Sequence, residues 1–356
     1  MEARRKILYA LQGTGNGHVA RARELVPLIA SIPGVDLQLW ISGTKSELSL
    51  GWPVHRQFPG LTFYYSKRGG IYWAGTILRN NWIRLLWDIL RAPVGEFDII
   101  INDFEPISAW AAWIKGAPLW ACSHQYAVMH AKSPKPKKRQ KAIEKFMFWL
   151  APHRRGIGFH FDAFAPSIFP PIIRREIRHQ IQQTSHALLV YLPAYHPKVL
   201  IPILQELNLP IYAFFAGDFE PYTLGHIQVK SISSEAFLQA FSRVDSVLCG
   251  AGFELPTEAL FHGKRLAVVP IQHQYEQSCN GSAAQNFGAW LFTKLKKKHV
   301  KKLQRWLVSP LPRAIKWPDQ SLDLMTRMIQ GELEFRKTEQ ALPRPDVFDW
   351  DQFPVT

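Results

Sequence analysis

Short apolar runs alternate with longer amphipathic stretches along most of this chain. The short runs predict buried strands, and apolar residues repeating every three or four positions predict helices. In the first half, expected strands cover Ile7–Gln12, Asp36–Ser42, Phe97–Asn102 and Pro118–Cys122, and expected helices cover Val19–Ser31 and Pro106–Lys115. This alternation is typical of an α/β protein with a parallel sheet.

A second series of the same kind begins near His186. Its expected strands are His186–Tyr191, Ile211–Phe215, Ser246–Cys249, Arg265–Val269 and Ala289–Phe292, and its expected helices are Ser234–Ser242, Glu254–His262 and Glu276–Phe287. Two such series predict two doubly wound, Rossmann-like domains joined around residues 175–185. We expect a first domain over 1–180, a second over 181–320, and a final helix and tail over 321–356.

The composition is that of a folded globular protein, and it excludes several other classes of protein. The 356 residues, 47% hydrophobic and 20% charged, suit about two domains rather than a disordered chain. Three widely spaced cysteines exclude a disulfide framework and a cysteine-based zinc motif, and they suit a reducing compartment. No signal-peptide-like region precedes the first strand, and no apolar run reaches the roughly 18 residues of a spanning helix. The sequence predicts a cytoplasmic protein.

The charge is unevenly distributed. The net charge is +15, and residues 129–180 hold 12 lysines and arginines against three acidic residues. This basic segment, an expected insert in the first domain, contains Lys135–Arg139 and the aromatic run Phe146–Leu150, and Trp73–Arg91 also mixes tryptophan, leucine and arginine. Such mixing fits contact with an anionic membrane surface. It equally fits a solvated basic face over ordinary core residues.

A glycine-rich loop, Gly13–His18, joins the first strand to the first helix. It is not a dinucleotide fingerprint, because the third glycine would fall at His18 and the second strand ends without an acidic residue. No Gly-Lys-Ser/Thr follows, so it is not a P-loop. Asp103 follows the expected strand Phe97–Asn102 at the same predicted sheet edge, where it could orient His18 as a general base. The alternative is a helix-capping histidine and a turn aspartate.

The second half repeats the strand, glycine turn and helix. Small residues at Gly250–Gly252 would open a helix N-terminus to a diphosphate, and Glu258 could accept both hydroxyls of a ribose. Amides and acids suited to sugar hydroxyls follow the next strand, at Gln272, His273, Glu276, Gln277 and Asn280. Taken alone, each glycine-containing turn would be interpreted as an ordinary turn with no ligand-binding role.

Together these pieces resemble a known family. Gly13–His18 with Arg21, then Asn102–Pro106, then Ser123–Gln125 resemble the acceptor half of a GT-B glycosyltransferase. Gly250–Lys264, with Glu258 inside it, and Val269–Asn280 resemble the donor half more specifically. The chain is similar, from residue 6 to about residue 310, to the UDP-glycosyltransferases related to the N-acetylglucosaminyltransferase that makes lipid II.

The resemblance implies a GT-B fold, two doubly wound Rossmann-like domains facing across a cleft. It implies inverting transfer of a sugar from a UDP-sugar substrate to an acceptor hydroxyl, with no cofactor, no metal ligands, and His18 and Asp103 as the catalytic pair. The implied donor site is Gly250, Ala251, Gly252, Phe253, Glu254, Glu258, Gln272, His273, Glu276, Gln277 and Asn280. The implied acceptor site is Gly15, Asn16, Gly17, Arg21, Glu105 and His124.

Three departures from the family pattern affect these expectations. Asn280-Gly281 stands where the family often has Asn-Ala, and Phe253 replaces a smaller residue beside the expected diphosphate site. The basic segment 129–180 replaces the family's acceptor-side signature. The identity of the acceptor therefore cannot be carried over from the family to this chain. That segment favours a lipid or lipid-phosphate acceptor, with the protein peripheral to the inner face of an anionic membrane.

Two other functions compete with transfer. An epimerase of the UDP-N-acetylglucosamine type would share the fold and the donor loop, and Glu105 and Asp162 could supply its acid and base. A non-enzymatic nucleic-acid-binding protein would use the positive charge, but the sequence has no helix-turn-helix, zinc-finger or ribonucleoprotein signature. No nucleic-acid partner is expected.

Overall fold

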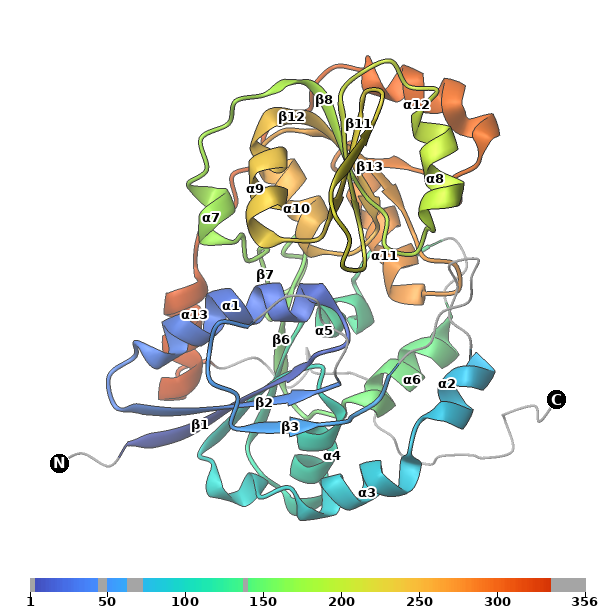
Figure 1. Ribbon diagram of the computed structural model, residues 1–356. Helices are drawn as coiled ribbons and strands as arrows, with labels where there is room; N and C mark the ends of the chain where they lie inside the picture. The colour runs from blue at the N-terminus through green and yellow to red at the C-terminus, as the bar shows by residue number, and fades with distance from the viewer. Residues whose placement is uncertain (1–3, 44–49, 63–72, 137–139, 334–356) are drawn as a thin grey trace.

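The computed structural model describes residues 4–43, 50–62, 73–136 and 140–333. Two parallel α/β sheets of seven strands each are stacked one above the other (Figure 1). The connection between them falls between Phe169, the last residue of the first sheet, and Ser185, the first of the second. The predicted pair of doubly wound domains is confirmed.

The first sheet has the strand order β3-β2-β1-β4-β5-β6-β7, with every strand pair parallel. Its strands are β1 (Arg5–Gln12), β2 (Val35–Ser42), β3 (Arg56–Phe58), β4 (Ile99–Asp103), β5 (Leu119–Cys122), β6 (Gly156–Phe159) and β7 (Ile168–Phe169). Its helices are α1 (Asn16–Ala30), α2 (Trp73–Arg79), α3 (Trp82–Arg91), α4 (Pro106–Lys115), α5 (His124–Met129) and α6 (Lys141–Leu150). The short α7 (Arg175–Arg178), in the connection between the sheets, lies against the second domain (Figure 1).

The second sheet has the order β10-β11-β9-β8-β12-β13-β14, parallel except for the edge strand β10. Its strands are β8 (Ser185–Tyr191), β9 (Ile211–Phe215), β10 (Tyr222–Leu224), β11 (Ile227–Ser231), β12 (Val244–Gly250), β13 (Arg265–Val269) and β14 (Trp290–Leu291). Its helices are α8 (Pro197–Leu204), α9 (Ser234–Arg243), α10 (Glu254–Phe261), α11 (Tyr275–Gln285) and α12 (Val300–Leu307).

The central strands are buried on both faces, as a parallel sheet covered by helices requires. The last six residues of β1 and all five of β4 are buried. The final helix, α13 (Ser321–Gln330), follows the second domain in sequence but packs beside α1 of the first (Figure 1). It therefore ties the end of the second domain back to the first.

The basic segment 129–180 is not an insert, and this expectation was wrong. It supplies β6 and β7, which extend the first sheet with register pairs such as Gly158 with Ile168. Lys135 is bonded inside the fold, with its amine 2.9 Å from the Glu144 carboxylate. The neighbouring basic residues 137–139 lie outside the described residues.

Among the residues that the structure describes, no helix is both long enough and apolar enough to cross a bilayer.

Candidate active site

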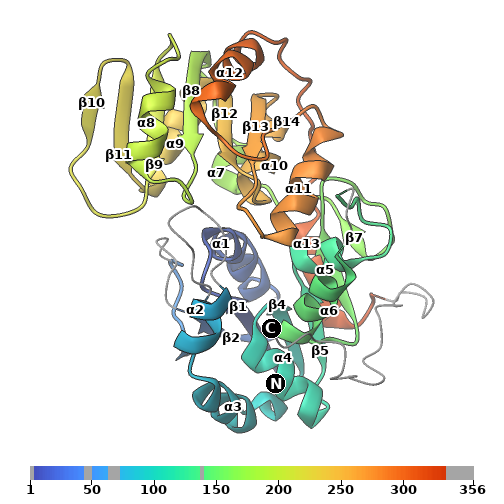
Figure 2. The same ribbon diagram turned by 90° about the vertical axis from the view of Figure 1, so that its right-hand side faces the viewer.

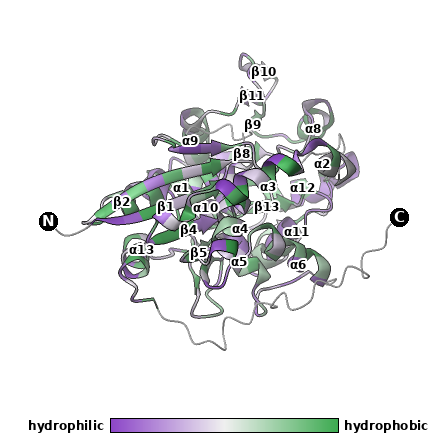
Figure 3. Cartoon of the chain, turned by 90° about the horizontal axis from the view of Figure 1, so that it is seen from below, coloured by the Kyte–Doolittle hydropathy of each residue, from purple (hydrophilic) through white to green (hydrophobic). Residues whose placement is uncertain are grey.

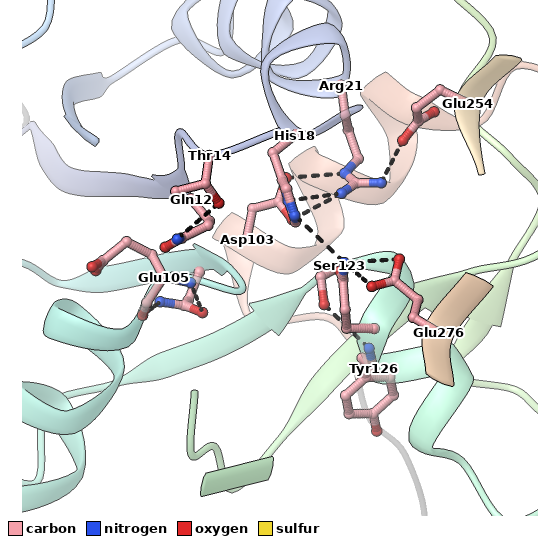
Figure 4. Close-up of polar contacts among 12 residues, drawn as sticks. Gln12, Thr14, His18, Arg21, Asp103, Glu105, Ser123, Tyr126, Glu254 and Glu276 are labelled. Atoms are coloured by element: carbon pink, nitrogen blue, oxygen red, sulfur yellow. Dashed lines mark hydrogen bonds and ion pairs between the residues drawn. The ribbon is translucent and has the colours of Figure 1, made fainter. Parts of the chain in front are cut away.

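His18 and Asp103 meet at the carboxyl edge of the first sheet (Figure 4). β1 leads into α1, which carries His18, and Asp103 ends the neighbouring strand β4. His18 Nδ1 lies 2.9 Å from Asp103 Oδ1. Burial raises the pKa of Asp103, but Arg21 and His18 outweigh burial and hold that pKa below its usual value. The charged carboxylate accepts the Nδ1 proton, which leaves His18 Nε2 able to take another.

Arg21 occupies a different place from the one expected for an acceptor contact. Its guanidinium is buried, and it donates to both oxygens of Asp103, at 3.0 and 2.9 Å. Its Nη1 donates to Glu254 Oε1 of the second domain at 2.6 Å (Figure 4). Arg21 therefore holds the Asp103 carboxylate and links it to Glu254 in the first turn of α10.

The turn after Asp103 is tight and strained. Phe104 has φ +58°, a left-handed conformation that a bulky residue rarely adopts, and such strain gathers at functional sites. The Asn102 side chain donates to the Glu105 carbonyl at 2.7 Å and to Ser108 Oγ at 2.9 Å, which fixes the turn. Asp103 is thus held in place by its own backbone as well as by Arg21.

Glu105 is not an acceptor residue, and this expectation was wrong. Its carboxylate is buried and caps α4, accepting from the backbone of Ile107 at 2.7 Å and of Ser108 at 2.6 Å, and from Ser42 Oγ. Asp162, its partner in the epimerase alternative, is exposed on the surface. The pair proposed for epimerase chemistry is therefore not assembled.

The second glycine loop ends β12 and begins α10, whose first backbone N–H groups have no side-chain cap. Gly250, Gln272 and Gln277 line a narrow cleft together with Pro270 and Ile271. Gln277 Oε1 accepts from the Ile271 backbone at 2.9 Å, which closes one side of this cleft. An uncapped helix start beside a cleft suits an anionic group.

Phe253 points away from that cleft and packs between the domains. Its ring stacks on His124 with centroids 3.8 Å apart and nearly parallel planes, and Phe161 meets it edge-on at 5.2 Å. Burial lowers the pKa of His124, so this ring is neutral in the stack. The aromatic replacement at position 253 fills the interface between the two domains.

Glu258 is buried, and Arg174 binds both of its oxygens. Nε lies 2.6 Å from Oε1 and Nη2 lies 2.8 Å from Oε2. The carboxylate expected to hold a ribose is therefore already paired. Sequence reasoning missed Arg174, because the segment containing it gave a signal only of positive charge.

The remaining donor and acceptor residues meet along the seam between the domains. Gln125 Nε2 donates to Glu276 at 3.1 Å and lies 3.4 Å from His18 Nε2, and His124 Nε2 lies 2.7 Å from Asn280 Oδ1. Two buried amide atoms, Gln125 Oε1 and Asn280 Nδ2, have no partner among the described residues.

Three expected residues lie at the edges of this seam. Asn16 Nδ2 donates to the Tyr191 hydroxyl of the second domain at 3.2 Å. A Cβ at Gly17 would lie 3.5 Å from Glu254 Cγ, so the starts of α1 and α10 face each other, with Gly15 just before them. His273 is exposed in a left-handed turn, with φ +64°. Within the described parts of the chain, no three histidine, cysteine or acidic side chains gather as metal ligands.

The fold and this site define a glycosyltransferase with the GT-B fold. The chain belongs to glycosyl transferase family 1, whose family model matches residues 5–308. No curated protein matches it in sequence.

Three solved structures illustrate the likeness in fold. MurG of Acinetobacter baumannii is 16% identical with a TM-score of 0.53, over 92% of this chain and 99% of that one. S. aureus MnaA, solved with UDP, is 8% identical with a TM-score of 0.59, over 92% and 96%. A protein from Listeria monocytogenes described as a UDP-N-acetylglucosamine 2-epimerase is 9% identical with a TM-score of 0.52, over 93% and 97%.

Proposed function

We propose that this protein transfers a sugar from a UDP-sugar to an acceptor hydroxyl, with inversion and without a metal. The observation that carries the proposal is the His18–Asp103 pair, 2.9 Å apart, set opposite the uncapped start of α10. The Arg21–Glu254 contact brings the two halves together. A base on one side and an anion-stabilising helix start on the other are the two parts that a direct displacement needs.

In this mechanism His18 Nε2 takes the proton of the acceptor hydroxyl. The acceptor oxygen attacks the anomeric carbon, and the bond from that carbon to the diphosphate oxygen breaks as UDP leaves. Asp103 stabilises the imidazolium, and backbone N–H groups of Gly250–Glu254 stabilise the charge developing on the diphosphate. Attack opposite to the leaving group inverts the anomeric configuration.

The donor would lie along the second domain. The diphosphate would bind Gly250, Ala251 and Gly252, and Glu258 would accept from the ribose with Arg174 still bound, since each carboxylate oxygen has a second lone pair. The sugar would contact Gln272, His273, Glu276, Gln277 and Asn280. The unpartnered amide of Asn280 supports this assignment.

The acceptor would enter over Gly15, Asn16 and Gly17, beside His18. We propose a lipid or lipid-phosphate acceptor reached from the cytoplasmic face of an anionic membrane. The excess of +15 charges and the exposed apolar surface of α3 support this choice.

Thermal unfolding with a panel of nucleoside diphosphates and nucleotide sugars, in the presence of EDTA, tests the donor site. We expect UDP and one UDP-sugar to raise the melting temperature, because a ligand bound only to the folded state stabilises it. Gln277→Ala should lose this shift, while Gln239→Ala, on α9, should keep it. No shift with any nucleotide in folded protein would contradict the proposal.

A turnover assay on the same purified protein tests whether His18 is the general base. His18→Gln should keep the UDP shift but lose turnover of the UDP-sugar by about 10²–10⁴-fold, the usual contribution of a general base. His179→Gln, an exposed histidine, is the matched control and should leave turnover unchanged. Equal turnover of His18→Gln and the native protein would show that another group takes the proton.

A further inference from the structure

A lysine-rich segment follows the last strand of the second sheet. Residues 277–318 contain nine lysines and arginines and no acidic residue. Four of the lysines lie within five positions, between β14 and α12: Lys294, Lys296, Lys297 and Lys298. The side chains of the last three are exposed. We name these four residues the lysine edge.

The lysine edge lies beside the narrow cleft at the end of β12. β14 pairs in parallel with β13, and β13 with β12, so these three neighbouring strands end at the same edge of the sheet (Figure 2). The backbone N–H of Leu295, between the first two lysines, donates to the Tyr195 hydroxyl at 2.9 Å. Tyr195 lines the cleft together with Gly250 and Gln277. The lysine edge is therefore anchored to a wall of the cleft.

No described carboxylate neutralises the lysine edge. None of its four side chains belongs to an ion pair within the described parts of the chain. Burial lowers the pKa of His299, the residue after Lys298, and three neighbouring lysine charges lower it further, as a locally positive potential would. The arginines of the site are different, because Arg21 and Arg174 are buried against carboxylates. The lysine edge therefore presents uncompensated positive charge.

Two exposed acids, Asp218 and Glu220, follow another strand of this sheet, β9. Seen from below, β9 lies on one side of β8 and β13 lies on the other (Figure 3). In the sheet order, four strand spacings separate β9 from β14, which is roughly 19 Å at about 4.8 Å for each spacing. The positive charge is therefore concentrated on the β14 side of the sheet, and the acids follow a strand on the other side.

We propose that the lysine edge attracts the anionic nucleotide donor to the cleft and raises its association rate without bonding it. Charges of one sign beside a cleft raise the association rate of an oppositely charged ligand by about 10–10³-fold. Consecutive Cα atoms are about 3.8 Å apart, so the backbone on either side of Leu295 lies within a Debye length of the cleft wall, about 10 Å at 0.1 M salt.

Lysine suits attraction at a distance better than binding in one geometry. Its ammonium is a strongly hydrated point charge on a flexible stem, and it has no planar fork to fix a phosphate. Exposed charges at the rim of a site change the association rate and its salt dependence more than the dissociation rate. The inference deepens the proposed function and rests on it for the identity of the ligand, a nucleoside diphosphate.

Stopped-flow mixing with UDP, followed by tryptophan fluorescence, measures the association and dissociation rate constants separately. At an ionic strength of about 0.1 M, Lys296→Gln/Lys297→Gln/Lys298→Gln should lower the association rate constant by about tenfold. The dissociation rate constant should change by less than about twofold, because the bonds to bound UDP are unaltered. At about 1 M, where the Debye length is about 3 Å, the native protein and the variant should associate with UDP at equal rates.

The matched control, Arg243→Gln/Arg313→Gln/Lys316→Gln, removes three exposed charges from the opposite edge of the same sheet. Arg243 directly precedes β12, and the segment with Arg313 and Lys316 packs on the end of α10, where Ile315 N–H donates to the Leu260 carbonyl at 3.0 Å. The five residues of β13 separate the two edges by about 17 Å, more than the Debye length at 0.1 M. The control should therefore associate with UDP within about twofold of the native rate.

Three results would overturn the inference. The first is an association rate of the lysine variant equal to that of the native protein at about 0.1 M. The second is an equal loss in the control, because the net charge of the whole chain would then attract UDP. The third is a faster dissociation of UDP from the lysine variant with no change in association, because the lysines would then bond the nucleotide directly.

The same measurement separates this inference from the proposed function. Failure of the native protein to bind UDP at all would remove the proposed function together with this inference. UDP binding at equal rates in the native protein and the lysine variant would remove this inference alone. Without ligand, all three proteins should melt at the same temperature, because the changed side chains are exposed.

Discussion

Three carboxylates at the centre of the site are bonded to arginines. Arg21 holds Asp103 and Glu254, and Arg174 holds Glu258. Burial lowers the pKa of both arginines, but the adjacent carboxylates outweigh it and raise both pKa values, so both side chains stay charged. Burial raises the pKa of Glu254 to about 7, with Arg21 opposing the rise. The site therefore depends on paired charges, and loss of one partner leaves the other buried alone.

Arg174→Met tests this dependence directly. The substitution leaves the buried Glu258 carboxylate without its partner, and the free energy of unfolding should fall by about 3–5 kcal/mol. Arg174→Met/Glu258→Gln should recover part of that loss, because no charge is then left unpaired. Urea unfolding measures both, and exposed Arg175→Met is the neighbouring control. A full loss in the double variant would mean that packing of Arg174, rather than its charge, stabilises the site.

The sequence predicts the centre of the site because a parallel sheet brings strand ends together. His18 and Asp103 each follow a buried strand, and the strand-end rule was enough to place them side by side. Arg174 and Glu258 are 84 residues apart, and neither belongs to a motif that names the other. Glu105 misled for the opposite reason: a carboxylate just before a helix is as suited to a cap as to a substrate.

At the scale of elements, two glycines let α5 approach β6 closely. A Cβ at Gly158 would lie 2.7 Å from the backbone nitrogen of Ala127, and one at Gly156 would lie 2.8 Å from Cδ2 of Tyr126, both residues of α5. Real Cβ atoms do not come so near to backbone atoms. Because α5 carries His124 and Gln125, these glycines set the position of two residues that contact the second domain.

Gly158→Ala should therefore displace α5 and lower both stability and turnover. The overpacked contact is expected to cost about 1–3 kcal/mol of unfolding free energy, since backbone atoms cannot move aside as a side chain could. Urea unfolding and the rate of UDP-sugar turnover check this. Gly95→Ala is the control, because a Cβ there meets no atom within 4 Å. An unchanged Gly158→Ala protein would show that α5 is not held at this distance.

The central elements follow from the sequence, and the peripheral ones do not. β1, β4, β8 and β13 are long apolar runs, and their expected bounds differ from the observed ones by two residues or fewer. The two-residue β7 and the glycine-containing β6 are too short for a periodic pattern, and the basic residues around them hid their role. Their strand character comes from pairing at the sheet edge.

The whole molecule is held together across the two domains. The buried Leu324, Met325 and Met328 of α13 complete the first domain after the chain has left it. The seam adds the Arg21–Glu254 and Gln125–Glu276 contacts. Because these contacts join the two domains, a substitution in either domain should change the free energy of unfolding measured on the full chain.

Buried neutral histidines make that stability depend on pH. Burial lowers the pKa of His153 to about 4 and of His160 to about 3. His153 lies between the rings of Tyr126 and Phe148, with Nδ1 2.8 Å from the Ala151 carbonyl oxygen. In the unfolded chain each histidine would take up a proton near pH 6.5. Their contribution to stability is therefore complete above that pH and is lost as the pH falls toward the folded pKa.

His153→Gln isolates one of these contributions. Between about pH 6.5 and about pH 5, the native protein should lose about 1.4 kcal/mol per pH unit more than this variant, because only the native chain gains a proton at this position on unfolding. Urea unfolding across that range gives both curves, and all other titrating groups cancel in their difference. His179→Gln, an exposed histidine, should run parallel to the native curve. If His153→Gln also ran parallel to it, the His153 ring would have to gain its proton in the folded protein, which its buried aromatic surroundings oppose.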